Sequence, residues 1–187
     1  ILLLCGKLWE IQYGQYKMNQ FFSGTYPVKL DSKNRFVLPQ SLRYALVEEG
    51  ELEFYIALSM GGCLAIYKKS DMQKIVEGFK QKRHIAKFQK FFTLFFSTLY
   101  HTGVDKIGRV SLSKTLKESV GIEQEIMLVG SMDKIQVWPK QAYEKEVAAL
   151  MNESNHQSFA DLWQEALNDS QQETLEGVLE KREVIKV

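Results

Sequence analysis

The chain has 187 residues, of which 45% are apolar and 25% charged, a composition typical of a globular protein with one ordinary domain or two very small ones. Cys5 and Cys63 are isolated, which excludes a disulfide framework or a cysteine-based zinc knuckle and fits a reducing compartment. The net charge of +1 conceals an asymmetry, because residues 18–117 carry 16 basic and 8 acidic residues, whereas residues 118–187 carry 6 and 14. A basic first part indicates an anionic partner, although charged helical surfaces alone would also produce this distribution.

Residues 1–19 are expected to lie outside the fold, as an extension. The apolar run at residues 1–5 is too short for a signal peptide, and no small residue precedes Cys5 as lipoprotein processing requires. Met18 is a candidate natural start. The richest apolar stretch, residues 88–99, is about twelve residues long, short of the roughly 20 that a membrane-spanning helix needs, so no membrane partner is expected.

The first elements of the fold are predicted from residue 25 onward. Apolar residues alternate along 25–31 and 35–38, which indicates two short strands. The connection between them ends in Asn34, a residue that tolerates positive φ, so the two strands are predicted to form a hairpin. Pro39 then suits the first turn of a helix. That helix has apolar positions at Leu42, Ala45 and Leu46 and ends near Gly50.

A strand pair and two helices follow. Strands are predicted over 53–58 and 64–67, joined by a glycine turn, and a helix over 70–81. A second helix over 88–99 gives the strongest periodic signal in the chain, because six apolar residues form one broad stripe. We expect this stripe to be buried in the protomer core or in a subunit interface. Its members are Phe88, Phe91, Phe92, Phe95, Phe96 and Leu99.

The same order of elements returns 74 residues later. Residues 104–112 repeat the strand–loop–strand pattern, with Gly108 at the position of Asn34. Ser113 is a candidate N-cap for a short helix that ends near Gly121. Strands over 125–130 and 135–138 and a helix over 140–152 complete the copy. Eight of the 22 positions from residue 21 to residue 42 are identical at this offset, namely Phe21/95, Phe22/96, Ser23/97, Tyr26/100, Asp31/105, Arg35/109, Leu38/112 and Leu42/116.

We therefore predict an α+β fold in which two tandem repeats of β-hairpin and short helix form one pseudo-two-fold domain. The repeats cover residues 25–71 and 104–147, and helices in residues 72–103 connect them. Residues 148–187 are predicted to be an acidic helical tail with a weaker apolar stripe, made of Phe159, Leu162, Trp163, Ala166 and Leu167.

Two D-x-x-x-R loops at matched positions carry the functional signal: Asp31-Ser32-Lys33-Asn34-Arg35 and Asp105-Lys106-Ile107-Gly108-Arg109. One such loop occurs by chance in many proteins, but two in matched surroundings are specific. Together with Phe22-Ser23-Gly24, Pro39, residues 125–130 and Trp138, they make residues 20–150 resemble the MraZ family of bacterial transcriptional regulators. The AbrB-like domains of that family belong to the swapped-hairpin class of DNA-binding folds.

The resemblance implies a sequence-specific regulator of double-stranded DNA. It would bind direct repeats upstream of its own operon, the division and cell-wall gene cluster. Family members assemble as rings, so a homo-oligomer is expected in which many loops face DNA together. The implied location is cytoplasmic and nucleoid-associated, with no cofactor and no small-molecule substrate.

Arg35 and Arg109 are the residues expected to contact DNA most directly, because a guanidinium fork matches phosphate oxygens or a guanine edge. Asp31 and Asp105 are expected to accept turn N–H groups and to orient the arginine four residues on. Lysines would bind phosphates and make binding salt-dependent. The full predicted set is Lys29, Asp31, Lys33, Asn34, Arg35, Asp105, Lys106, Gly108 and Arg109. The first loop carries more positive charge, so Arg35→Ala is expected to cost more affinity than Arg109→Ala.

Simpler interpretations remain open for the same residues. Each Asp–Arg pair alone would be an ordinary surface ion pair. The alternative function is an oligomeric scaffold that binds a protein partner through its Phe-rich helix or its acidic tail. The basic run at residues 80–83 would be a second DNA patch or, more simply, a solvated helix end.

An enzyme is not expected. An arginine beside each loop aspartate would hold that carboxylate ionised and unsuited to acid catalysis. The three histidines, His84, His101 and His156, lack the spacing of metal ligands and are expected to be structural or solvated.

Overall fold

The computed structural model describes residues 21–151, 159 and 161–167. Most predicted elements are confirmed with their ends within two residues. There are two exceptions: β5 precedes the strand expected at residue 104, and α2 ends at Leu46 instead of near Gly50. The strands are β1 (Thr25–Lys29), β2 (Arg35–Val37), β3 (Glu53–Leu58), β4 (Leu64–Lys68), β5 (Tyr100–Gly103), β6 (Arg109–Ser111), β7 (Glu125–Ser131) and β8 (Lys134–Pro139). The helices are α2 (Gln40–Leu46), α3 (Lys69–Gln81), the 3-10 turn η1 (Ala86–Phe88), α4 (Gln89–Thr98), α5 (Lys114–Ser119) and α6 (Lys140–Met151).

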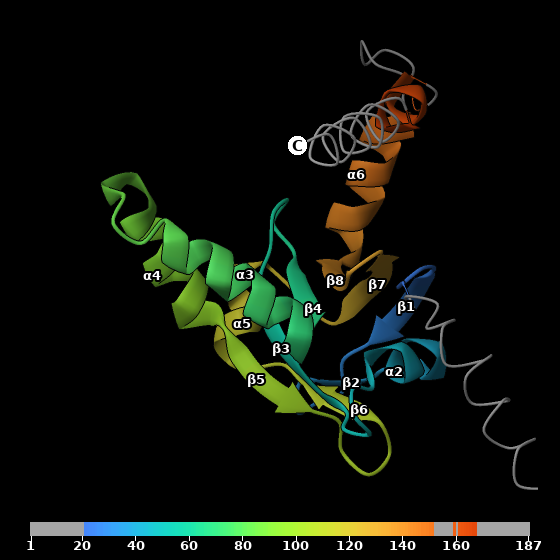
Figure 1. The fold of residues 1–187 in the computed structure, drawn as a ribbon. Coiled ribbons are helices and arrows are strands. Elements are labelled where there is room, and N and C mark those ends of the chain that lie inside the picture. Colours follow the sequence, from blue (N-terminus) through green and yellow to red (C-terminus); the bar gives the residue numbers. More distant parts are fainter. Residues whose placement is uncertain (1–20, 152–158, 160, 168–187) are drawn as a thin grey trace, which may run out of the picture. The chain divides into compact units, whose positions relative to one another are not determined.

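The strands form one six-stranded antiparallel sheet, in the order β1-β7-β8-β4-β3-β5, and one two-stranded sheet of β2 and β6 (Figure 1). We call the two-stranded sheet the ribbon. Exchanging each strand for its counterpart in the other repeat gives the same order read from the opposite edge of the sheet, because β1 matches β5, β3 matches β7 and β4 matches β8. The predicted pseudo-two-fold α+β domain is therefore confirmed, with its axis between β4 and β8.

The hairpin predicted from residues 25–31 and 35–38 is wrong in its strand pairing. β1 pairs with β7 and β2 pairs with β6, so both strands of the first repeat find partners in the second. β5 lies just before the predicted start of the second repeat but matches β1 at the 74-residue offset, and it pairs in turn with β3 of the first repeat. Among the strands of residues 21–151, only β3 with β4 and β7 with β8 are hairpins within one repeat. The two repeats thus exchange strands, in keeping with the swapped-hairpin class.

Alternating side chains bury both faces of the large sheet at its centre. On β3, Phe54 and Ile56 point into a core that also holds Leu42 of α2 and Leu116 of α5, whereas Ala57 faces the opposite side. This period of two is what the pleat of a strand imposes. The main core lies between the sheet and the ribbon with α2 and α5, and the second cluster lies beneath α3 and α4.

The stripe of α4 is only partly buried. Its rings surround Phe79 of α3, with centroid distances of 5.1 Å to Phe95 and 5.2 Å to Phe92. Phe95 is 7% exposed, but Phe91 and Phe96 remain 47% and 44% exposed. The stripe therefore contributes to the protomer core on one side and leaves an apolar surface on the other.

A second compact unit begins at Gln141 and includes most of α6. Residues 161–167 are helical there, and Phe159 and Trp163 lie 6.1 Å apart between ring centroids. The rest of the predicted acidic tail, like residues 1–19, lies outside the described residues. Within the described part of the chain, every helix is too short or too polar to cross a membrane.

Candidate nucleic-acid interface

The two D-x-x-x-R segments form loops of the same geometry, which we call loop 1 (residues 31–35) and loop 2 (residues 105–109). In loop 1 the N–H of Asp31 donates to the carbonyl of Arg35 at 2.7 Å, and the N–H of Asn34 donates to the carbonyl of Asp31 at 3.0 Å. Loop 2 repeats both bonds at 2.9 Å. Asn34 has φ +55° and Gly108 has φ +83°. The prediction of positive φ at these two positions is confirmed, and it explains why Asn and Gly stand there.

Each aspartate organises its own loop. Oδ1 of Asp31 accepts the backbone N–H groups of Lys33 and Arg35 at 2.8 and 2.9 Å. Oδ2 of Asp31 accepts Nε and Nη2 of Arg35 at 2.9 and 2.7 Å. Asp105 bonds in the same way to the backbone of Ile107 and Arg109 and, at 2.7 Å, to Nε of Arg109. The predicted contacts of both aspartates are therefore present.

These bonds keep both carboxyl groups ionised. The side chain of Arg35, followed by the backbone N–H of Arg35, lowers the pKa of Asp31 to about 2. The backbone N–H of Arg109 is the main cause of the lowered pKa of Asp105, and the guanidinium of Arg109 adds to it. An ionised carboxylate cannot donate a proton, so its role here is to fix the arginine.

The ribbon brings the two arginines to one surface. β2 and β6 are antiparallel, with Arg35 opposite Ser111, Phe36 opposite Val110 and Val37 opposite Arg109. Opposed residues share a face of a sheet, and residues two apart along one strand do as well. Phe36 and Val110 are 1% and 0% exposed and point into the core. Arg35 and Arg109 therefore both lie on the outward face, on either side of the axis.

The predicted lysines differ in their surroundings. Lys33 and Lys106 are exposed at the loops. Lys29 lies on β1 instead, where its Nζ is 2.9 Å from Oε1 of Glu125. Glu125 also binds Lys140 at 2.9 Å, and these two lysines, Lys29 first, lower the pKa of Glu125 to about 2. Lys29 therefore lies on β1, outside loop 1, and shares one carboxylate with Lys140, so Glu125 offsets its charge only in part.

Two basic residues that the motif did not predict contact the loops. Arg43 of α2 lies on Gly108, since a Cβ atom built on that glycine would be 2.9 Å from Cζ of Arg43. Nζ of Lys117 of α5 donates to Oδ1 of Asn34 at 3.2 Å. Each residue reaches the loop of the other repeat. The signal that would have found them is the 74-residue offset, which matches position 43 to position 117.

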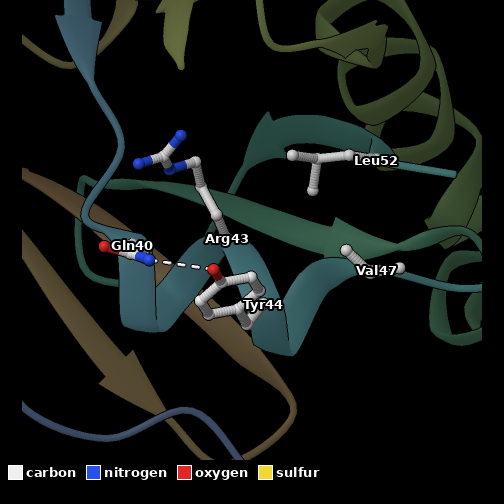
Figure 2. Close-up of a pocket in the computed structure, with 5 residues that line it drawn as sticks. All are labelled: Gln40, Arg43, Tyr44, Val47 and Leu52. Carbon is white, nitrogen blue, oxygen red and sulfur yellow. Dashed lines mark hydrogen bonds between the residues drawn. The ribbon is translucent and has the colours of Figure 1, made fainter. Parts of the chain in front are cut away.

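Arg43 also borders a small hollow on α2, of about 150 Å³, lined by Gln40, Arg43, Tyr44, Val47 and Leu52. Figure 2 shows its guanidinium turned away from the apolar side chains of Val47 and Leu52. The hydroxyl of Tyr44 accepts a hydrogen bond from Nε2 of Gln40 at 2.8 Å. The volume of the hollow is too small for a drug-sized ligand, which needs roughly 300 Å³ or more.

The described residues also contain no group of three or more histidine, cysteine or acidic side chains that would hold a metal ion.

Comparison with known proteins agrees with this arrangement. A family model described as "MraZ protein, putative antitoxin-like" matches the chain twice, over residues 21–94 and 95–174. Among curated proteins, the chain is 28% identical to "Transcriptional regulator MraZ" of Lachnoclostridium phytofermentans over 138 residues, which cover 73% of this chain and 95% of that protein. It is 33% identical to the protein of the same name in Lactobacillus helveticus over 125 residues, 66% of this chain and 84% of that relative.

The two matches of the family model follow the internal repeat seen in the sheet, and together they span most of the chain. The curated relatives are covered nearly over their full length. The chain belongs to the MraZ family.

Proposed function

We propose that this protein is a transcriptional regulator that binds double-stranded DNA through loop 1 and loop 2. The observation that carries the proposal is the shared outward face of Arg35 and Arg109, each held by an ionised aspartate. The names of the relatives, both transcriptional regulators, point the same way.

The chemistry of the loops suits a DNA groove. A two-stranded ribbon fits the major groove of B-form DNA. A guanidinium whose Nε is held by a carboxylate keeps other N–H donors free for a guanine edge or a phosphate. Lys33 and Lys106 would bind phosphates on either side, while Asn34 and Gly108 shape the turns that present them. Lys29 would contribute less, because it lies on β1, where it is paired with Glu125.

The DNA target proposed is a set of direct repeats upstream of the protein's own operon, in the division and cell-wall gene cluster. This part rests on the family resemblance. It also fits a cytoplasmic, nucleoid-associated protein. Repeated operator sites require several loops to be presented together, which leads to the oligomeric state.

We propose that the active form is a homo-oligomeric ring. Two features support an interface between protomers: the apolar surface left on α4, which includes Phe91 and Leu94, and the sheet edges at β1 and β5. The two loops of one protomer carry few cations beyond their Asp–Arg pairs. Several protomers on adjacent repeats bind more tightly through effective concentration, with no new contact needed.

The experiment that tests the proposal is a binding titration with duplex DNA from upstream of the protein's own gene. Arg35→Ala and Arg109→Ala are each expected to weaken binding, by about 1–3 kcal/mol if the arginine reads a guanine. Lys74→Ala is the matched control, because Lys74 is exposed on α3, is paired with an aspartate like each loop arginine, and lies outside both loops. If both loop variants stay folded and bind like the parent, the assignment of the loops is wrong.

The structure changes the expected ranking of the two variants. The larger effect of Arg35→Ala was expected from the extra charge of Lys29, but Lys29 lies on β1, outside loop 1, where it is paired with Glu125. Each loop then contains one lysine, one arginine and one aspartate. Each is also contacted by one cation from the opposite repeat, Lys117 at loop 1 and Arg43 at loop 2. Similar losses of affinity are now expected, and the same titration measures them.

The alternative function is a scaffold that binds a protein partner. The salt dependence of binding distinguishes it from DNA binding. DNA affinity falls steeply as salt rises, whereas an apolar protein contact hardly responds. Deleting residues 155–187 would abolish scaffold binding through the tail and leave DNA affinity intact if the loops are the interface.

A further inference from the structure

The two loops are held in place by the opposite repeat. The N–H of Leu38 donates to the carbonyl of Gly108 at 3.0 Å, and the N–H of Leu112 donates to the carbonyl of Asn34 at 3.0 Å. These two bonds are related by the pseudo-two-fold axis, because both pairs match at the 74-residue offset. They join the segment before each short helix to the left-handed residue of the other loop. α2 therefore starts beside loop 2, and α5 starts beside loop 1.

Arg43 and Lys117 use this crossing to reach the loops. They occupy matched positions of α2 and α5. Arg43 covers Gly108, which is buried, and Lys117 bonds to the side chain of Asn34. The sizes are complementary, since the broad guanidinium lies over the glycine and the slender lysine meets the asparagine. Each loop thus carries a cation that belongs to the other repeat.

These two cations are electrostatically different from the loop arginines. Arg35 and Arg109 are each bonded to an aspartate, so each pair is close to neutral. Among the described residues, Arg43 and Lys117 form no ion pair with a carboxylate. Nε of Arg43 is buried and has no hydrogen-bond partner in the part of the chain that the structure describes. A side chain needed only for packing would be better served there by an apolar residue, because a buried polar group without a partner is costly.

We propose that Arg43 and Lys117 are phosphate-binding residues, and that each completes the DNA-contacting loop of the other repeat. Arg43 would extend the cationic surface of loop 2, and Lys117 that of loop 1. This inference rests on the proposed DNA-binding function. It adds two contacts outside the D-x-x-x-R motif and makes each half of the interface a composite of both repeats.

The first test is the salt dependence of DNA binding. Arg43→Met and Lys117→Met keep an unbranched apolar stem and remove the charge. Each is expected to weaken binding to operator and to random duplex DNA alike, and to reduce the slope of log affinity against log salt by about 0.9 per lost contact. Arg43→Lys should retain the slope. Lys87→Met is the matched control, because Lys87 is an exposed cation of η1, outside both loops and outside the basic run at residues 80–83.

The second test asks which loop each cation serves. Arg43→Met is combined with Arg109→Ala in one double variant and with Arg35→Ala in another. Residues of one composite site couple, whereas distant sites add. Non-additive losses are expected for Arg43 with Arg109, and additive losses for Arg43 with Arg35.

The outcomes separate this inference from the function on which it rests. If the parent shows no salt-dependent DNA binding, the proposed function fails. If the parent binds and Arg35→Ala weakens it, but Arg43→Met and Lys117→Met keep the parent's slope, the function stands and this inference is overturned. A change with Lys87→Met as large as with Arg43→Met also overturns it, because the effect would then be one of total charge. Lys117→Met decides the matter for loop 1 if Arg43→Met fails to fold.

Discussion

The aspartate of each loop sets the conformation of the loop and the position of its arginine with one carboxyl group. In loop 1, Oδ1 of Asp31 accepts hydrogen bonds from the backbone, and Oδ2 accepts them from the guanidinium of Arg35. Lys33 and Arg109 could be identified as loop residues from the motif alone. Arg43 could not, because a motif describes neighbours in sequence, and Arg43 reaches Gly108 only through the fold.

The ionisation of Asp31 gives a direct test of this arrangement. The pKa of Asp31 is about 2 in the folded protein and ordinarily 3.8. The ionised carboxylate therefore stabilises the fold fully above its ordinary pKa, and that contribution is lost as the pH falls through about 2. The carboxyl carbon resonance of Asp31, followed by NMR against pH, is expected to have its midpoint near the lower value. In Arg35→Ala the midpoint should rise; a parent midpoint near 3.8 would contradict the proposed bonds.

The short helices show how local signals fix elements. α5 begins after Ser113, whose Oγ accepts the N–H of Leu116 at 3.2 Å, as predicted for an N-cap. α2 begins after Pro39, which has no side-chain acceptor and acts through its fixed φ. α5 has only six residues, too few to be stable in isolation, so its cap and the burial of Leu116 must hold it.

Removing this cap is expected to lower stability. Ser113→Ala leaves the N–H of Leu116 without its acceptor and should reduce the free energy of unfolding by about 0.5–2 kcal/mol. Urea denaturation monitored by circular dichroism measures the change. Ser113→Asp retains an acceptor at the same place and should remain close to the parent. Equal stability of parent and Ser113→Ala would show that Leu116 alone holds α5.

The elements were predictable, and several of their partners were not. Alternating apolar residues and turn residues place β1, β2 and loop 1 correctly, because these signals are local. The sequence pattern does not determine whether β1 pairs within its own repeat or with β7, because both repeats contain strands of the same pattern. The exchange is decided by the closure of the whole sheet. The apolar stripe of α4 likewise predicts that the helix packs against the rest of the protein. It does not predict how much of the stripe the neighbouring elements cover.

At the scale of the molecule, the apolar surface on α4 bears on assembly. Leu94 is 52% exposed and lies three residues after Phe91 of the same helix, which is 47% exposed. If this surface joins protomers in the proposed ring, Leu94→Arg is expected to shift the protein to smaller species without changing its unfolding temperature. Light scattering after size-exclusion chromatography measures the mass.

The control for this experiment is Met60→Arg. Met60 is 85% exposed in the turn between β3 and β4, so it matches the change in charge at an apolar position away from α4. It should leave the mass of the parent unchanged. An unchanged mass for Leu94→Arg would assign the interface to another surface, such as the edges at β1 and β5.

The exchange of strands also determines what holds the two halves together. Four of the six strand pairings between described strands, β1 with β7, β2 with β6, β3 with β5 and β4 with β8, join one repeat to the other. The covalent connection near residues 82–85 runs outside all of them. A nick in the polypeptide at that point would leave two interlocked fragments, each completing the sheet of the other. The two repeats of the chain are therefore arranged like the two subunits of a strand-exchanged dimer. The peptide link keeps them close together, while the strand pairings between them determine the fold.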